Sequence, residues 1–313
     1  MRAAQINKYG GSDVVEINKN AAKPAVAAGR VLVEVYAAGI NPVDWKIREG
    51  YMSKMVPLPF PATLGGDFSG VIQEVGAGVT GFKKGDEVYG RDGFPATGSG
   101  SFADMISVDT KVIALKPKNL NHVEAAALPL TGLSAIQALT EHIGLTKGKK
   151  ILIHGGAGGI GSMAIQLAKH LGAYVATTAA EKDISFVKQL GADQAIDYKK
   201  QSFDNILKDY DAVYDTVGGE TYTRSHKVLK KGGIIVSMLE QPKADLMKQY
   251  GVKAIGQFTQ PSAERLKKLT DLVEKGVIKV HVDKTFPLEQ AREALDYQQQ
   301  GKAVGKVVIK IKK

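Results

Sequence analysis

The sequence contains no cysteine in its 313 residues. Disulfide bonds, thiolate nucleophiles and every zinc site built on cysteine are therefore excluded. The six histidines are scattered along the chain, without the paired spacing of a metal-binding helix. Catalysis in this chain is therefore expected to use no metal.

Aromatic residues are also scarce, at 7%, and tryptophan occurs once. The net charge of +10 would suit an anionic partner, but the basic runs are short and carry no interleaved aromatic side chains. Nucleic acid is therefore not expected as the main partner.

Long apolar runs are missing as well. No stretch approaches the ~20 residues of a membrane-spanning helix, and the first residues lack the charged-then-apolar order of a secretory signal. We therefore expect no membrane insertion and a cytoplasmic location.

The chain changes character twice. Residues 1–120 are rich in glycine and in short β-type runs, which is typical of a compact β-barrel domain. Residues 121–259 alternate strands with helices, which predicts a parallel, doubly wound α/β sheet. Residues 260–313 contain two helical segments and a closing strand, and we expect this strand to complete the first domain.

The strongest local signal is a glycine loop between a strand at 151–153 and an amphipathic helix. Gly156, Gly158 and Gly161 have the G-x-G-x-x-G spacing, which provides a tight turn, close approach to a pyrophosphate and close helix packing. The helix dipole then favours the diphosphate. The candidate dinucleotide contacts in this loop are Gly156, Ala157, Gly158, Gly159, Ile160 and Gly161.

The next strand, YVATTA, ends without a carboxylate. NAD enzymes usually carry an acid there for the ribose hydroxyls, whereas an uncharged end suits a 2′-phosphate. Thr178, Lys182 and Tyr198 are the candidate partners of that phosphate, which favours NADPH. Glu181 lies close by and leaves NAD open as the alternative.

Several motifs in one order resemble the medium-chain dehydrogenase/reductase superfamily, and within it the zinc-independent quinone oxidoreductase branch. The resemblance rests on the stretches AAGINPVDWKIREG, PATLGGDFSGVIQEVG, GFKKGDEVYG, LPLTGLSAIQAL, the glycine loop and the ending GKAVGKVVIKI. It implies a GroES-like domain, a Rossmann domain, and a homodimer or homotetramer. The zinc alcohol dehydrogenases carry a cysteine where this chain has Asn41, and a His-Glu pair where it has Gly66 and Asp67.

The resemblance also implies the site residues. Asn41, Asp44 and Tyr51 are the candidate catalytic residues, although Asn41 before Pro42 could simply cap a turn and solvent could supply the proton. The remaining candidate cofactor contacts are Thr131, Val217, Ser237, Met238, Phe258 and Lys306, the last of which could approach the cofactor phosphates.

The resulting hypothesis is an NADPH-dependent reductase of quinones or other small conjugated carbonyls. One alternative is an enoyl-thioester reductase, and another is an NADPH-binding protein that binds RNA with little turnover. The sequence does not identify the natural acceptor.

Overall fold

The structure is a computed structural model that describes residues 1–55, 57–92 and 99–312. The chain forms two compact units. Unit 1 comprises residues 1–130, 260–276 and 280–313, and unit 2 comprises residues 131–259 and 277–279.

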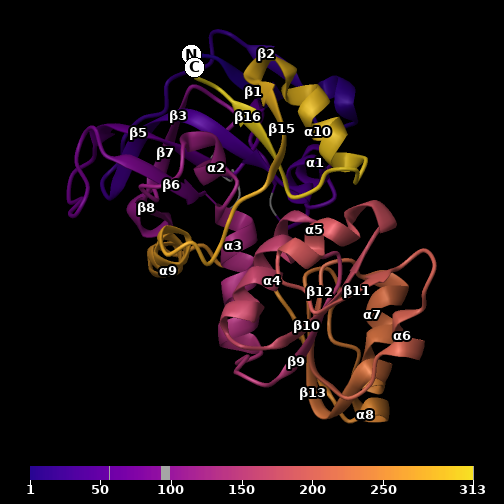
Figure 1. The fold of residues 1–313 in the computed structure, drawn as a ribbon. Helices are drawn as coiled ribbons and strands as arrows, with labels where there is room; N and C mark the ends of the chain where they lie inside the picture. The colour runs from indigo at the N-terminus through magenta and orange to yellow at the C-terminus, as the bar shows by residue number, and fades with distance from the viewer. Residues whose placement is uncertain (56, 93–98, 313) are drawn as a thin grey trace. The chain divides into compact units, whose positions relative to one another are not determined.

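Unit 1 contains two sheets in the described part of the chain (Figure 1). The larger has seven strands, in the order β15-β16-β3-β5-β6-β8 with β7 paired to β3, and the smaller has the order β2-β1-β4. The strands are β1 (Ala3–Ile6), β2 (Glu16–Asn18), β3 (Arg30–Ile40), β4 (Ala62–Thr63), β5 (Asp67–Val75), β6 (Glu87–Arg91), β7 (Met105–Asp109), β8 (Ile113–Leu115), β15 (Val282–Pro287) and β16 (Lys306–Lys310).

The helices of unit 1 come both from the first 130 residues and from the C-terminal part of the chain. They are α1 (Pro42–Arg48), α2 (His122–Ala126), α9 (Ala263–Glu274) and α10 (Ala291–Gln299). Val33, Phe68 and Leu295, from β3, β5 and α10, are buried in one apolar cluster. This cluster therefore joins segments that are far apart in the sequence.

The closing strand β16 pairs antiparallel with β3, with Val307 opposite Ile40. It also pairs parallel with β15. Unit 1 is therefore discontinuous in the sequence. Because β3 ends at Ile40, this register brings Lys306 next to the residue that follows β3, Asn41.

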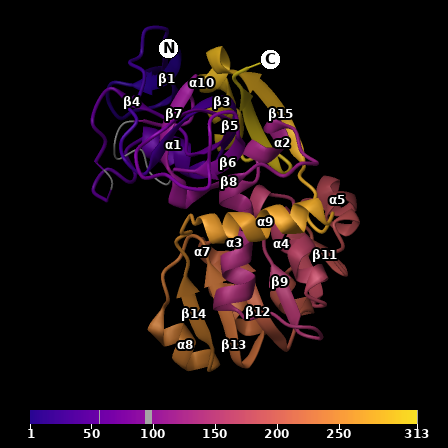
Figure 2. The same cartoon turned by 90° about the vertical axis from the view of Figure 1, so that its left-hand side faces the viewer.

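Unit 2 contains a parallel sheet of six strands in the order β11-β10-β9-β12-β13-β14. Its strands are β9 (Lys150–Ile153), β10 (Tyr174–Ala179), β11 (Gln194–Asp197), β12 (Tyr210–Asp215), β13 (Leu229–Ser237) and β14 (Lys253–Gly256), and Figure 2 shows β9, β12, β13 and β14 next to one another. Ile151, Leu152 and Ile153 are fully buried, as in a central strand that is covered on both faces. The predicted doubly wound sheet is confirmed.

The helices of unit 2 follow the alternation that the sequence predicts. They are α4 (Gly159–His170), α5 (Ile184–Gln189), α6 (Phe203–Ile206), α7 (Gly219–Ser225) and α8 (Ala244–Tyr250), and the short 3-10 turns are Ser12–Val14, Thr110–Val112, Glu181–Asp183, His226–Val228 and Leu288–Gln290. Among the described helices of the chain, none combines the length and apolar character needed to cross a membrane.

Residues 123–144 have helical periodicity in the sequence, but the structure divides them. After α2 a new helix, α3 (Pro129–Ile136), begins at a proline, and a π-helix follows at Gln137–His142. Proline lacks the N–H that would continue a preceding helix, and it is well suited to a first helical position. Thr131 is therefore the third residue of α3. The unit boundary also falls inside α3 instead of before α2.

Candidate active site

The glycine loop has the strand-turn-helix form that a diphosphate site needs. It leaves β9 and runs into α4, whose N-cap is Gly158. A Cβ on Gly156 would lie 2.1 Å from Thr177 Oγ1, and a Cβ on Gly161 would lie 2.2 Å from the Gly155 carbonyl oxygen. These two glycines are therefore required by packing inside the protein.

Gly158 differs from these two glycines. A Cβ there would meet only the Gly155 carbonyl oxygen, at 3.3 Å, and the backbone has φ −77° and ψ 172°, which other residues adopt. Its lack of a side chain therefore leaves free space at the start of α4, where helix N–H groups lack intrahelical acceptors. This space fits a pyrophosphate.

A buried histidine connects this loop to its neighbours. Ser225 Oγ lies 2.6 Å from the Thr221 carbonyl, which can only accept, so the serine proton is used there. Ser225 then accepts from His154 Nε2 at 2.9 Å. The other ring nitrogen, Nδ1, accepts from the Thr178 hydroxyl at 3.0 Å. Burial lowers the pKa of His154 to about 3, so the ring is neutral.

The Thr178 hydroxyl thus already has its acceptor. Its oxygen also accepts from the Gly155 N–H, at 3.3 Å, and the residue is buried. The hydroxyl is therefore not available to donate to a 2′-phosphate, which corrects the expectation for this side chain.

The end of β10 has exposed basic side chains. Lys182 follows the strand and is exposed, and Tyr198, which follows the paired strand β11, is 57% exposed. Lys200 Nζ lies 2.5 Å from Glu181 Oε1, and this exposed pair compensates the nearby carboxylate. At this edge of the sheet the exposed Lys182 and Tyr198 offer side-chain donors, while Glu181 and Asp183 place carboxylates nearby.

A buried carboxylate holds the loops after β12 and β13. Asp215 accepts from the N–H groups of Val217 and Gly218, each at 3.0 Å, and from Ser237 Oγ at 2.7 Å. Ser237 Oγ accepts in turn from the Leu239 N–H, at 3.2 Å. The Ser237 hydroxyl is therefore part of the loop framework.

Apolar side chains stand exposed on these loops. Val217 and Phe258 are each 49% exposed, and Met238 is partly buried. Leu239, which the sequence analysis missed, is 52% exposed. Its signal was its place directly after the strand-end pair Ser237 and Met238. These four residues, which we call the apolar platform, follow the carboxyl ends of the neighbouring parallel strands β12, β13 and β14, where ligands of such sheets bind.

A second cluster lies in unit 1 and contains Asn41 and Asp44. Asn41 is the N-cap of α1, and its backbone N–H donates to Asp44 Oδ2 at 2.7 Å. Asn41 and Asp44 form a capping box at the start of α1. In addition, Asn41 Nδ2 donates to Asp67 Oδ2 at 2.8 Å, and Oδ1 accepts from Lys306 Nζ at 2.5 Å. The Asn41 side chain therefore combines its cap position with contacts to two charged groups.

Lys306 is 3% exposed, and its ammonium group also donates to the Ile40 carbonyl at 2.7 Å. It lies 3.9 Å from Asp67 Oδ2. An ammonium group held in this way is not free to bind a phosphate, which corrects the expectation for Lys306. It is instead a neighbour of the candidate catalytic asparagine.

The counter-ion of Asp67 is Arg91, whose Nη1 lies 2.7 Å from Asp67 Oδ1. A Cβ on Gly66 would lie 2.9 Å from the same Nη1 atom. Gly66 therefore leaves the room that the guanidinium group uses. A larger side chain at this position would displace Arg91 from Asp67.

Burial changes the proton affinity of two members of this cluster. It raises the pKa of Asp44 to about 7, against the opposing effect of Arg91. It lowers the pKa of Lys306 to about 8, against the opposing effect of Asp67. Both groups are thus brought close to neutral pH.

Tyr51 is not part of this cluster. It follows α1, is 73% exposed, and packs edge to face on Trp45 with ring centroids 6.1 Å apart. Thr131 is buried in α3. Within the described residues, no group of three or more His, Asp and Glu side chains is arranged to hold a metal ion.

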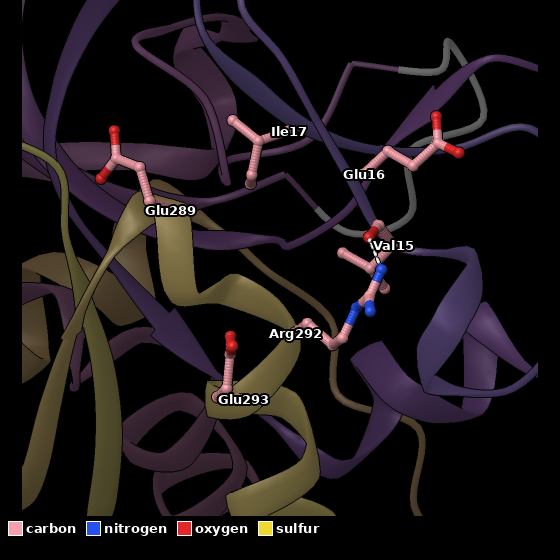
Figure 3. A pocket seen from close by; sticks show the side chains of 6 residues that line it. All are labelled: Val15, Glu16, Ile17, Glu289, Arg292 and Glu293. Atoms are coloured by element: carbon pink, nitrogen blue, oxygen red, sulfur yellow. Dashed lines mark hydrogen bonds between the residues drawn. The ribbon is translucent and has the colours of Figure 1, made fainter.

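One pocket of unit 1 lies apart from the candidate residues. It has a volume of about 280 Å³ and is lined by Val15, Glu16, Ile17, Glu289, Arg292 and Glu293 (Figure 3). Arg292 donates to the Val15 carbonyl at 2.9 Å, and Glu289 is paired with Arg2. Arg292 and Glu289 are thus engaged within the protein, and none of the candidate site residues lines this pocket.

Comparison with known proteins gives a consistent result over the whole chain. Residues 27–118 match the alcohol dehydrogenase GroES-like domain, and residues 190–309 match a family described as zinc-binding dehydrogenase. A 2-methylene-furan-3-one reductase of Solanum lycopersicum is 40% identical over 99% of this chain and 79% of its own length. A chloroplastic NADPH-dependent alkenal/one oxidoreductase of Arabidopsis thaliana is 37% identical over the same shares. The solved structure of the quinone oxidoreductase from Coxiella burnetii has a TM-score of 0.92 and 34% identity, and the match covers 100% of this chain and 99% of that one.

The glycine loop gives a first prediction. Gly158→Ala should fold with little loss of stability but bind NADPH at least about tenfold more weakly, because the methyl group enters the space left for the pyrophosphate. Gly161→Ala should lower the melting temperature, because its Cβ overlaps the Gly155 carbonyl. Thermal unfolding and NADPH titration distinguish the two variants. Unchanged NADPH affinity in Gly158→Ala would contradict the assignment of this space.

The Asp44 carboxyl gives a second prediction. Its pKa is raised from 3.8 to about 7 on folding, so the folded state holds more protons between these values. Its contribution to stability is therefore fully present below about pH 4 and is lost as the pH rises through 7. The free energy of unfolding of the wild type, minus that of Asp44→Asn, should decrease from pH 4.5 to 7.5. Urea unfolding at a series of pH values measures this difference, and a constant difference would refute the prediction.

Proposed function

The chain belongs to the zinc-independent quinone oxidoreductase branch of the medium-chain dehydrogenase/reductase superfamily, and from this premise we propose that it reduces quinones or other small conjugated carbonyls with NADPH. The observation that carries the proposal is the glycine loop, which combines packing-restricted Gly156 and Gly161 with an open Gly158 at the start of α4. The names of the tomato and Arabidopsis relatives support the substrate class.

Bound NADPH would supply the hydride. The cofactor would lie on unit 2, with its pyrophosphate at the start of α4 and its nicotinamide on the platform of Val217, Met238, Leu239 and Phe258. Asp215 and Ser237 would keep the platform loops in place through their hydrogen bonds. These residues bind and orient the cofactor.

The acceptor requires a donor for the negative charge that develops on its oxygen. Asn41 Nδ2 carries two N–H groups, and Asp67 uses one of them. We assign the second to the substrate oxygen. Hydride addition to the β-carbon of an enone moves an electron pair to that oxygen, and a solvent proton then completes the α-carbon. Tyr51 would border the site and guide that water.

The 2′-phosphate of NADPH would meet Lys182, Tyr198 and Lys200 at the end of β10 and β11. Lys200 already compensates Glu181, so this carboxylate repels the phosphate less than an unpaired acid would. Thr178 does not contribute its hydroxyl. A cytoplasmic location and a homodimer or homotetramer stay predictions from the sequence.

The enoyl-thioester and RNA-binding alternatives are tested in the same assays. NADPH oxidation should be fast with 2-alkenals and quinones, slow with enoyl thioesters, and unaffected by extensive chelation. Tyr51→Phe should lose less than the ~100-fold expected for an essential proton donor. Activity restricted to enoyl thioesters, or salt-sensitive RNA binding without turnover, would refute the proposal.

Cofactor choice gives a further prediction. Lys182→Gln should raise the NADPH dissociation constant about tenfold and leave that of NADH unchanged, because a charge-assisted hydrogen bond contributes about 1.5–3 kcal/mol. Lys188→Gln, an exposed position on α5, serves as the control. Fluorescence titration at fixed ionic strength measures both constants. Equal binding of the two cofactors by the wild type would show that the edge does not select NADPH.

A further inference from the structure

The amide orientation of Asn41 is determined by its neighbours. A lysine ammonium group can only donate and an ionised carboxylate can only accept. Lys306 must therefore face the Asn41 oxygen and Asp67 must face the nitrogen, as the distances of 2.5 Å and 2.8 Å indicate. A reversed amide would place the Nδ2 donor against the Lys306 ammonium group and the Oδ1 acceptor against the Asp67 carboxylate.

A buried ammonium group is costly unless it is well paired. Lys306 has two close oxygen acceptors, at Ile40 and Asn41, and Asp67 at 3.9 Å. The pairing of β16 with β3 places it there by register, since Val307 lies opposite Ile40. A methionine would fill a similar volume, but it would leave the Ile40 and Asn41 oxygens without this donor.

We propose that Lys306 is a positioning residue for the reduction: by holding the Asn41 carbonyl oxygen, it directs the second Nδ2 N–H to the substrate oxygen. The inference rests on the proposed role of Asn41. Loss of Lys306 removes one of the two groups that fix the amide, so that only Asp67, which keeps its ion pair with Arg91, still holds the Nδ2 end. The reaction then loses a preorganised donor, whereas the NADPH site on unit 2 is untouched.

The experiment measures kcat, KM and the NADPH dissociation constant, with trans-2-hexenal as the acceptor. Lys306→Met should lower kcat about 10- to 100-fold, because a misplaced donor costs on this order. Its NADPH dissociation constant should stay within about threefold, since no phosphate contact is removed. Lys306→Arg should recover part of the activity. Lys310→Met, an exposed position on the same strand, is the matched control and should behave as wild type.

A double-mutant cycle with Asn41→Ala tests whether Lys306 acts through Asn41. In the Asn41→Ala background, Lys306→Met should change kcat less than about threefold, because the group that it positions is gone. Multiplicative losses in the double variant would overturn the inference, as would an unchanged kcat with weakened NADPH binding. Melting temperatures establish folding, and Lys306→Gln replaces the methionine variant if that variant unfolds.

The cycle also separates this inference from the proposed function. If Asn41→Ala turns over trans-2-hexenal like the wild type, the role of Asn41 is refuted, and the role of Lys306 with it. If Asn41→Ala is impaired and Lys306→Met is not, only the inference about Lys306 is refuted.

Discussion

The Asp67 carboxylate is the interaction on which the site in unit 1 depends. It is fully buried and accepts from Arg91, from Asn41 and from the Leu130 N–H, the last at 3.1 Å. It thereby connects β5 and β6 with the starts of α1 and α3. Removing one partner from a buried ion pair typically costs about 3–5 kcal/mol, so the position of Asn41 is tied to the stability of the unit. Gly66 belongs to the same constraint, because it makes room for the guanidinium group.

Unit 2 also contains a buried carboxylate that holds neighbouring loops in place. Asp215 is fully buried and fixes the turn after β12 through two backbone N–H groups, while Ser237 extends the network to the loop after β13. His154 plays a similar part beside the glycine loop, because its two ring nitrogens join β10 to α7. In both units, buried carboxylates accept hydrogen bonds from backbone N–H groups. The side chains at the loop surfaces are thereby left available for ligands.

The sequence predicts the features that depend on local spacing. The glycine loop, the alternation of strands and helices and the fold class are of this kind, and the fold class is confirmed. Contacts between distant residues could not be predicted in this way. Lys306 meets Asn41 across 265 positions, and only the register of β16 on β3 brings them together. Whether the Thr178 hydroxyl can donate to a ligand depends on which atoms carry protons in the hydrogen-bond chain from Thr178 through His154 to Ser225. Residue spacing does not encode this. To predict the break before α3, Pro129 would have had to count for more than the helical periodicity around it.

The charges of the unit 1 cluster bear on which acceptors suit this chain. Asp67 is paired with Arg91, and Asp44 balances Lys306 only in part at neutral pH because its pKa is raised to about 7, so the cluster carries at most about one positive charge. It therefore cannot stabilise a localised alkoxide in the way that a divalent cation does. A fixed amide N–H contributes less, about 3–4 kcal/mol for one well-placed oxyanion donor. That contribution is enough only where the acceptor itself spreads the charge, as an enolate or a quinol anion does. The low charge of the cluster and the single donor that we propose at Asn41 thus favour conjugated acceptors over simple alcohols and ketones.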